Sequence, residues 1–214
     1  MPITPAAFVT SRRFAFHVCG AVNFDAIRKS RTLRSAQLIL AGSAHEYLLQ
    51  GRRDQTLSVP LSNGTVQIRD HKPLIRANME LVDGYSFDDF IQELNSRVFL
   101  WTGTEAGPCN SGRNHINKYL SEGSVFILRI PTKQLFEING VENLDITFCN
   151  SGSARQNKGI KAKRGRSTFM NLSAASRNPG DAVEITYKGS AQLPVGAKYA
   201  EKLSGPWQPL TADA

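Results

Sequence analysis

The sequence predicts an α+β fold in a single domain, and three observations support this prediction. Short apolar segments typical of strands recur along the chain, for example at 14–20 and 124–131. Segments with helical spacing of apolar residues, at 23–40 and 87–95, lie between them. The 214 residues are 41% hydrophobic, which is enough for one sizeable core. We therefore expect one domain over residues 1–214, with a flexible tail at 205–214.

In the first half of the chain, a strand leads directly into helical sequence. The segment FAFHVCG at 14–20 is the first expected strand, and a helix over 23–40 follows it, with a break near Thr32. Helical character continues to about Arg53. The Asn-Gly pair at 63–64 then predicts a turn, and the segment TVQIRD after it is short and extended.

The second half of the chain supplies one clear helix and several strands. Acidic residues near the start of 87–95 favour a helix there, and an apolar strand at 98–101 follows it. Further strands are expected at 124–131, 135–140 and 144–149. The last expected strand lies within GDAVEITYKG, residues 180–189.

A single carboxylate, Glu184, occupies the middle of this last strand. Successive side chains of a strand alternate between its faces, so Ile185 and Tyr187 would cover a core while Glu184 shares the other face with Thr186. Because Glu is almost never fully buried without a partner, an exposed strand face is the ordinary interpretation. A chemically active carboxylate is the alternative.

The charge of the chain favours a polyanionic partner such as nucleic acid. Its 26 Lys and Arg outnumber its 18 Asp and Glu, which gives a formal net charge of +8. Residues 150–180 contain no acidic residue but seven basic ones: Arg155, Lys158, Lys161, Lys163, Arg164, Arg166 and Arg177. A loop of this length either binds something or is mobile, so a loop that contacts phosphates and a solvated insertion are both open. Phe169 in this stretch could stack on a base or could pin the loop to the body.

The cysteines and the N-terminal residues indicate a cytoplasmic protein. Cys19, Cys109 and Cys149 have no close spacing, so they predict neither a disulfide framework nor a zinc site. Two arginines precede an apolar run near the N-terminus and imitate an export signal, but His17 interrupts the run and no small-residue cleavage site follows. No apolar stretch approaches the roughly 18 residues of a membrane span, so no membrane partner is expected.

Three separated segments combine into a recognisable order. FHVCGAVNFDAIRKSRTLRSA carries His17, LLQGRRDQTLSVPL carries Arg52 and Arg53 ahead of a Val-Pro pair, and AVEITYKGSAQLP carries Glu184 on a strand that leads to a proline. In this order they resemble the DarT family of DNA ADP-ribosyltransferases and, more broadly, the ADP-ribosyltransferase fold. The resemblance spans most of the chain through short motifs. The segment after the Arg motif departs from the family pattern and keeps only a proline, Arg76 and Met79 in compatible places.

The resemblance implies a fold of two small packed antiparallel or mixed sheets, with flanking helices around an NAD cleft. It implies that NAD is the substrate and that no metal takes part. Glu184 and Arg53 would be catalytic. The residues that would contact NAD are His17, Val18, Asn23, Arg52 and Arg69. The residues of the basic loop that would hold nucleic acid are Arg155, Lys158, Lys161, Lys163, Arg164, Arg166 and Phe169.

The chemistry of NAD cleavage explains why these residue types are wanted. The bond between nicotinamide and ribose breaks through a state with positive charge on the ribose, which a carboxylate such as Glu184 can stabilise while it accepts the proton of the nucleophile. A guanidinium such as that of Arg53 offers a rigid fork of donors to phosphate or ribose oxygens. His17 would orient the nicotinamide half of NAD.

The expected function is transfer of ADP-ribose from NAD to a nucleic-acid base. Single-stranded DNA is the favoured acceptor, because a base inside a duplex is sheltered. Such an enzyme would be a toxin or a phage-defence effector, and an antitoxin protein would then be a partner. Three alternatives stay open: modification of RNA or protein, simple NAD hydrolysis, and a basic nucleic-acid-binding module without catalysis.

Overall fold

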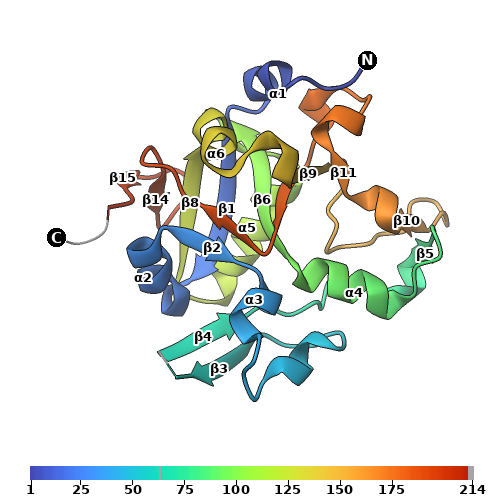
Figure 1. The fold of residues 1–214 in the computed structure, drawn as a ribbon, viewed down its shortest axis with the longest axis horizontal. Helices are drawn as coiled ribbons and strands as arrows, with labels where there is room; N and C mark the ends of the chain where they lie inside the picture. Colours follow the sequence, from blue (N-terminus) through green and yellow to red (C-terminus); the bar gives the residue numbers. More distant parts are fainter. Residues whose placement is uncertain (63, 212–214) are drawn as a thin grey trace.

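A nine-stranded sheet forms the centre of the molecule in the computed structural model, which describes residues 1–62 and 64–211 (Figure 1). Every neighbouring pair of strands in this sheet is antiparallel. In spatial order the strands are β11 (Met170–Asn171), β9 (Leu144–Thr147), β12 (Glu184–Lys188), β6 (Arg97–Thr104), β1 (Phe14–Gly20), β8 (Val125–Pro131), β14 (Lys198–Ala200) and β15 (Gln208–Pro209), with β7 (Gly107–Pro108) paired to β6.

Three two-stranded sheets surround the central one. The antiparallel pairs are β2 (Thr32–Arg34) with β13 (Ser190–Gln192) and β3 (Leu57–Leu61) with β4 (Gly64–Ile68), and the parallel pair is β5 (Met79–Leu81) with β10 (Ala162–Arg164). Figure 1 shows β3 and β4 beside α3 at one end of the molecule, and β5 and β10 beyond α4. The expected turn at 63–64 includes Asn63, which lies outside the described residues.

Helices and short 3-10 turns connect these strands. The helices are α1 (Pro5–Ser11), α2 (Ala21–Ser30), α3 (Ala36–Leu40), α4 (Phe87–Asn95), α5 (Asn110–Glu122) and α6 (Thr132–Asn139). The 3-10 turns are η1 (Glu46–Leu49), η2 (Arg76–Asn78), η3 (Val141–Asn143), η4 (Arg166–Thr168), η5 (Leu172–Ala174) and η6 (Pro179–Asp181). The expected α+β class is therefore observed.

Helix α4 begins where the acidic residues of its first turn predict. The side chain of Ser86 accepts a hydrogen bond from the backbone N–H of Asp89, and the Asp89 carboxylate accepts one from the backbone N–H of Ser86. This reciprocal capping satisfies two backbone donors and favours negative charge at the positive end of the helix dipole. Phe90, Ile91 and Leu94 then face the interior at helical spacing.

The main apolar core covers the face of the central sheet to which Ile185 and Tyr187 belong. These two side chains are almost fully buried, in one cluster with Phe8 and Leu100. Ile185 and Tyr187 therefore cover the core as predicted, but Glu184 and Thr186 on the other face of β12 are buried as well. A second cluster, which contains Phe16, lies on the α5 side of the sheet.

Several of the predicted elements differ from the observed ones. The expected helix at 23–40 begins two residues earlier, at Ala21, and has the predicted break near Thr32, which divides it into α2 and α3 because Arg31 adopts a left-handed conformation with φ of 48° and β2 follows it. The helix expected to continue to about Arg53 is reduced to η1. The strand expected at 135–140 is wrong, since this sequence belongs to α6 and buries Thr132, Leu135 and Phe136 at helical spacing.

The C-terminal tail is packed where the sequence predicts flexibility. Strand β15 pairs with β14, and Leu210 is 1% exposed in the main core. The guanidinium of Arg31 donates to the carbonyls of Leu210 and Pro194. The prediction of a flexible tail is therefore wrong for the end of the chain up to Leu210, because burial of that side chain and these hydrogen bonds hold it. Residues 212–214 lie outside the described residues.

Candidate functional site

The central sheet opens between β1 and β6 at its middle. These two strands pair over three residues only, and the last pair is Phe16 with Trp101. Strand β1 continues beyond this point and pairs with β8 as far as Gly20. His17, the first residue past the pairing, has its ring Nδ1 2.9 Å from the carbonyl oxygen of Phe99 on β6. A histidine side chain therefore bridges the two strands where backbone pairing ends.

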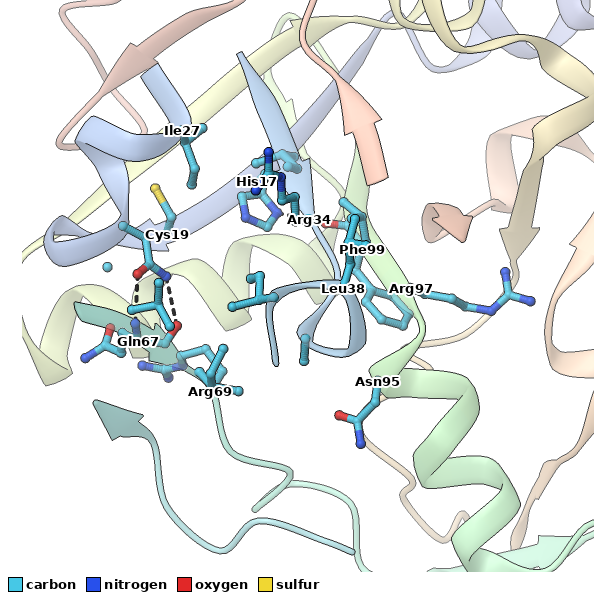
Figure 2. Close-up of a pocket in the computed structure, with 18 of the residues that line it drawn as sticks. His17, Cys19, Ile27, Arg34, Leu38, Gln67, Arg69, Asn95, Arg97 and Phe99 are labelled. Atoms are coloured by element: carbon cyan, nitrogen blue, oxygen red, sulfur yellow. Dashed lines mark hydrogen bonds between the residues drawn. The ribbon is translucent and has the colours of Figure 1, made fainter. Parts of the chain in front are cut away.

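A cavity of about 1420 Å³ lies at this opening. Its walls come from β1, α2, α3, β4, the junction of α4 with β6, α5, the turn at 150–153 and Glu184. Figure 2 shows His17 and Phe99 between Gln67 and Arg69 on one side and Arg97 on the other. Small-molecule sites commonly measure roughly 300–1,000 Å³, so this cavity has room for a ligand as large as a dinucleotide.

The carboxyl group of Glu184 lies in the wall of the cavity and is not exposed. The residue is 2% exposed, because β12 lies between β6 and β9 and the turn at 150–153 covers its other face. Glu184 Oε2 lies 2.9 Å from Thr147 Oγ1 and accepts a hydrogen bond from the backbone N–H of Ser151 at 3.2 Å. The interpretation of Glu184 as an exposed strand residue is therefore wrong.

Burial raises the pKa of Glu184 to about 7, although its hydrogen bonds and the positive charge of Arg164 act in the opposite direction. Thr147 adapts to either protonation state. Its hydroxyl has one proton and lies 2.9 Å from Glu184 Oε2 and 2.6 Å from the carbonyl oxygen of Cys149. It can donate to an ionised Glu184, or it can accept a proton from a neutral Glu184 and donate to Cys149. The Thr147 hydroxyl can therefore form a hydrogen bond with Glu184 in either protonation state.

His17 projects from β1 as a neutral imidazole. Burial lowers its pKa, and the hydrogen bond to the Phe99 carbonyl only partly opposes this. Because a carbonyl oxygen can only accept, Nδ1 carries the proton and Nε2 remains an acceptor. Val18, the next residue, lines the cavity as well.

Arg53 lines the cavity, but protein groups already occupy most of its donors. Its Nε donates to the carbonyl of Arg69 at 3.1 Å, and its Nη1 donates to the carbonyl of Leu48 at 3.0 Å. Its Nη2 donates to Asn95 Oδ1 at 2.8 Å and lies 3.1 Å from His71 Nε2. Burial lowers the pKa of Arg53 to about 10. This guanidinium holds the framework of the cavity and offers little of its fork to a ligand.

Two further predicted NAD contacts also have structural partners. Asn23 lines the cavity, and its side chain exchanges two hydrogen bonds of 2.8 Å with the backbone of Gln67, which join α2 to β4 (Figure 2). Arg52 is not among the cavity residues. It donates to the carbonyls of Leu74 at 3.0 Å and Lys72 at 3.1 Å, so it fixes the chain behind the cavity.

Arg69 is a predicted NAD contact that lines the cavity and has several partners of its own. Its guanidinium lies 3.3 Å from the centre of the Tyr119 ring, and its Nη2 donates to Glu122 at 2.8 Å. Its Nε is buried without a hydrogen-bond partner among the described residues. The Arg69 side chain is nevertheless 31% exposed, and a partly exposed cation in the cavity wall suits an anionic group of a ligand.

The sequence did not identify an aromatic wall on the α5 side. The ring of His115 lies 5.2 Å from that of Trp101 and 4.3 Å from that of Tyr119, and all three residues line the cavity. Burial first, and then the charge of Arg69, lower the pKa of His115 to about 4. The four-residue spacing of His115 and Tyr119 was the available signal, because such residues share a helix face.

The stretch at 150–180 is part of the folded body. Ala154, Leu172 and Ala175 are buried in it, and β10, β11 and three 3-10 turns interrupt it. The basic residues that remain exposed are Arg155, Lys158, Lys161, Lys163, Arg166 and Arg177. Two of them have partners, since Lys163 Nζ lies 3.9 Å from Glu80 and the Arg177 guanidinium lies 4.3 Å from the centre of the Phe148 ring.

Two of the predicted nucleic-acid contacts are buried instead. Arg164 is 5% exposed, since its guanidinium turns inward and donates to backbone carbonyls. Phe169 is 8% exposed, with its ring 6.1 Å from Phe90 and 6.3 Å from Phe99. Arg164 and Phe169 therefore present little surface to a nucleic acid, because hydrogen bonding and aromatic packing hold both inside. Phe169 pins the stretch to the body.

No helix among residues 1–62 and 64–211 is long and apolar enough to cross a membrane. In the same described part of the chain, no three His, Cys, Asp or Glu side chains are grouped as metal ligands. Comparison with curated proteins and with solved structures finds no match. Residues 13–190, well over half of the chain, match a family described as of unknown function, DUF7002. The chain therefore belongs to the DUF7002 family of unknown function.

Proposed function

We propose that this protein is an ADP-ribosyltransferase that transfers ADP-ribose from NAD to a base of a nucleic acid. One observation carries the proposal. The buried carboxyl of Glu184, with a pKa of about 7, lies in the wall of a cavity of about 1420 Å³ that His17 also lines. A group with this pKa populates both protonation states near neutral pH, as a general base requires. The order of the His17, Arg53 and Glu184 segments, which resembles the DarT family, supports the same chemistry.

In the proposed reaction the bond between nicotinamide and ribose breaks, and its electron pair leaves with nicotinamide. Ionised Glu184 stabilises the positive charge that develops on the ribose. A nitrogen of the acceptor base then forms the new bond to the ribose carbon, and Glu184 takes the proton that this nitrogen loses. The buried position strengthens the attraction between carboxylate and ribose, because the effective dielectric constant there is low.

The remaining cavity residues are assigned to binding of NAD. The neutral His17 offers Nε2 as an acceptor and would orient the nicotinamide half of the dinucleotide. Arg69 is the better candidate for the pyrophosphate, because its side chain is 31% exposed, whereas Arg53 is 7% exposed and protein groups occupy most of its donors. Arg53 then acts through Arg69, whose carbonyl it holds at 3.1 Å.

Binding of the nucleic-acid acceptor is assigned to the exposed basic side chains of residues 155–166. Arg155, Lys158, Lys161, Lys163 and Arg166 lie in the same stretch as the turn at 150–153, which lines the cavity. Their charge would attract phosphates in a salt-dependent manner. Single-stranded DNA is the favoured acceptor because its bases are accessible. A role as a toxin or phage-defence effector, with an antitoxin partner, belongs to this proposal.

Intact-mass spectrometry tests the proposal directly. The protein is incubated with NAD together with a single-stranded DNA oligonucleotide or its RNA counterpart, and the masses of both oligonucleotides and of the protein are measured. We expect the DNA to gain one ADP-ribose and free nicotinamide to appear. A gain on RNA or on the protein would instead identify that molecule as the acceptor, and nicotinamide alone would indicate a hydrolase.

The Glu184→Gln variant is the matched control, since the amide keeps the shape of the side chain and removes its charge. Retained activity in this variant would remove Glu184 from the reaction. Binding of oligonucleotide without any binding or cleavage of NAD would leave a nucleic-acid-binding module, and the proposed enzyme would be wrong.

A further inference from the structure

Arg164 differs from its basic neighbours in its direction. On the short strand β10, Lys163 is exposed, whereas the Arg164 side chain turns into the protein and is 5% exposed. The Arg164 guanidinium donates through Nη2 to the carbonyl oxygen of Asn150 at 2.9 Å and through Nη1 to that of Lys163 at 2.8 Å. A buried charge of this kind is retained only with such partners. The contact with Asn150 leads directly to Glu184.

The carbonyl of Asn150 and the N–H of Ser151 belong to one peptide unit. This unit is planar, and in the trans form its C=O and N–H point in opposite directions. Arg164 holds the oxygen end, and the N–H end donates to Glu184 Oε2 at 3.2 Å. A guanidinium on the carbonyl also polarises the peptide and strengthens its N–H as a donor. One peptide unit thus transmits both orientation and polarisation from Arg164 to Glu184.

We propose that Arg164 is a positioning residue for Glu184, which it controls through the peptide unit between Asn150 and Ser151. It fixes the direction of the Ser151 N–H and so favours the ionised carboxylate. The catalytic consequence of this role rests on the proposed function. The contact with the carboxyl group itself is independent of any enzymatic activity.

The other groups around Glu184 leave this role to Arg164. Thr147 on β9 supplies a neutral hydroxyl, and Trp101 opposite on β6 has no charge. Cys149 is the neighbouring thiol, and burial raises its pKa. His17 in the same cavity is neutral, since burial lowers its pKa. Arg164 is therefore the cation that acts on this carboxyl, and its removal should favour the protonated form.

Titration of the Glu184 carboxyl carbon by ¹³C NMR tests the inference, with Glu184→Gln to identify its signal. We expect Arg164→Met to raise the titration midpoint by about 1 unit, because a nearby opposite charge commonly lowers a carboxyl pKa by about 1–3 units. Arg166→Met is the matched control, since it removes an exposed charge two residues away. Its midpoint should equal that of the wild-type protein. Equal midpoints for Arg164→Met and Arg166→Met would overturn the inference.

Two additions keep the test decisive. If Arg164→Met does not fold, Arg164→Lys is the alternative variant, because it keeps the charge but cannot hold both carbonyls. The titration midpoint of Glu184 should still rise in this variant. An unchanged midpoint in a folded variant would contradict the positioning role. Nicotinamide release should shift with the same sign, its increase with pH moving to higher pH in Arg164→Met. A wild-type protein that releases no nicotinamide would disprove the proposed function and leave the NMR result to decide the inference.

Discussion

Replacing Glu184 by Gln should stabilise the folded protein at alkaline pH. The folded state keeps a proton on Glu184 up to about pH 7, because burial raises its pKa there from the ordinary 4.5. The unfolded chain loses that proton near pH 4.5. Between these two values the folded state binds more protons than the unfolded state, so the contribution of Glu184 to stability is lost as pH rises through this window. The neutral amide of Gln has no such loss.

The size of the effect follows from the two pKa values. A difference from 4.5 to about 7 is about 2.5 units, and each unit corresponds to about 1.36 kcal/mol, which gives about 3 kcal/mol. Most of this loss should occur between pH 5 and pH 8. The contributions of His71 and His115 to stability depend on pH in the opposite direction. Burial lowers their pKa values to about 3 and about 4, so the folded protein loses their contribution as pH falls. The difference between the variant and the wild-type protein isolates the carboxyl.

Urea unfolding at pH 5 and pH 8 measures this difference. We expect the free energy of unfolding of Glu184→Gln, relative to the wild-type protein, to be higher at pH 8 than at pH 5 by about 2–3 kcal/mol. Glu201→Gln is the control, since Glu201 is exposed and its replacement should change both values equally. A difference for Glu184→Gln that does not depend on pH would refute the raised pKa and, with it, the role of Glu184 as a base near neutral pH.

Three further predictions concern the activity and the framework. Nicotinamide release by Glu184→Gln should fall roughly a hundredfold or more while NAD binding measured by calorimetry persists, and equal loss of both would assign Glu184 to binding. Replacement of Lys161, Lys163 and Arg166 by Ala should weaken oligonucleotide binding and reduce its salt dependence, with NAD affinity unchanged. A parallel loss of NAD affinity would show that the NAD site and the oligonucleotide site are not separate. Arg53→Met should lower the free energy of unfolding by about 1–3 kcal/mol per carbonyl left without a donor, so a variant of wild-type stability would contradict its framework role.

Elements with a strong local pattern could be predicted from the sequence. The strand at 14–20 has the predicted boundaries, since a run of apolar residues at the centre of a sheet leaves few alternatives. The helix at 87–95 also has the predicted boundaries, because its capping residues mark its start. The local pattern at 135–140 was ambiguous, because its three apolar residues also fit a strand. The segment forms a helix in the structure, where Leu135 and Phe136 pack into the core.

The sequence grouped His17 and Glu184 through a resemblance, and the structure brings both to one cavity. It could not predict the burial of Glu184, because the turn that covers it lies more than 30 residues earlier in the chain and is held by a hydrogen bond from Arg164 to Asn150. Helix α5 was not predicted, because only Gly112 and Ile116 of its residues are buried and they give little apolar periodicity. A helix with so narrow an apolar stripe has a weak periodic signal.

The arginines explain why charge alone was an incomplete guide to the ligand surfaces. Arg53, Arg97 and Arg164 are each 7% exposed or less, and protein carbonyls, an amide oxygen, a hydroxyl and carboxylates accept hydrogen bonds from most of their donors. The Nε atoms of Arg97 and Arg164 are buried without a hydrogen-bond partner among the described residues. Positive charge buried in this way contributes little to attraction of a polyanion, because it is shielded from solution, and the charge of Arg97 is also paired with the carboxylates of Glu93 and Asp145. Arg69 differs from these three, because its side chain in the cavity wall is 31% exposed. An NAD pyrophosphate and a nucleic-acid backbone would therefore be bound by different cations, the first inside the cavity and the second on the exposed stretch, and single substitutions should separate the two affinities.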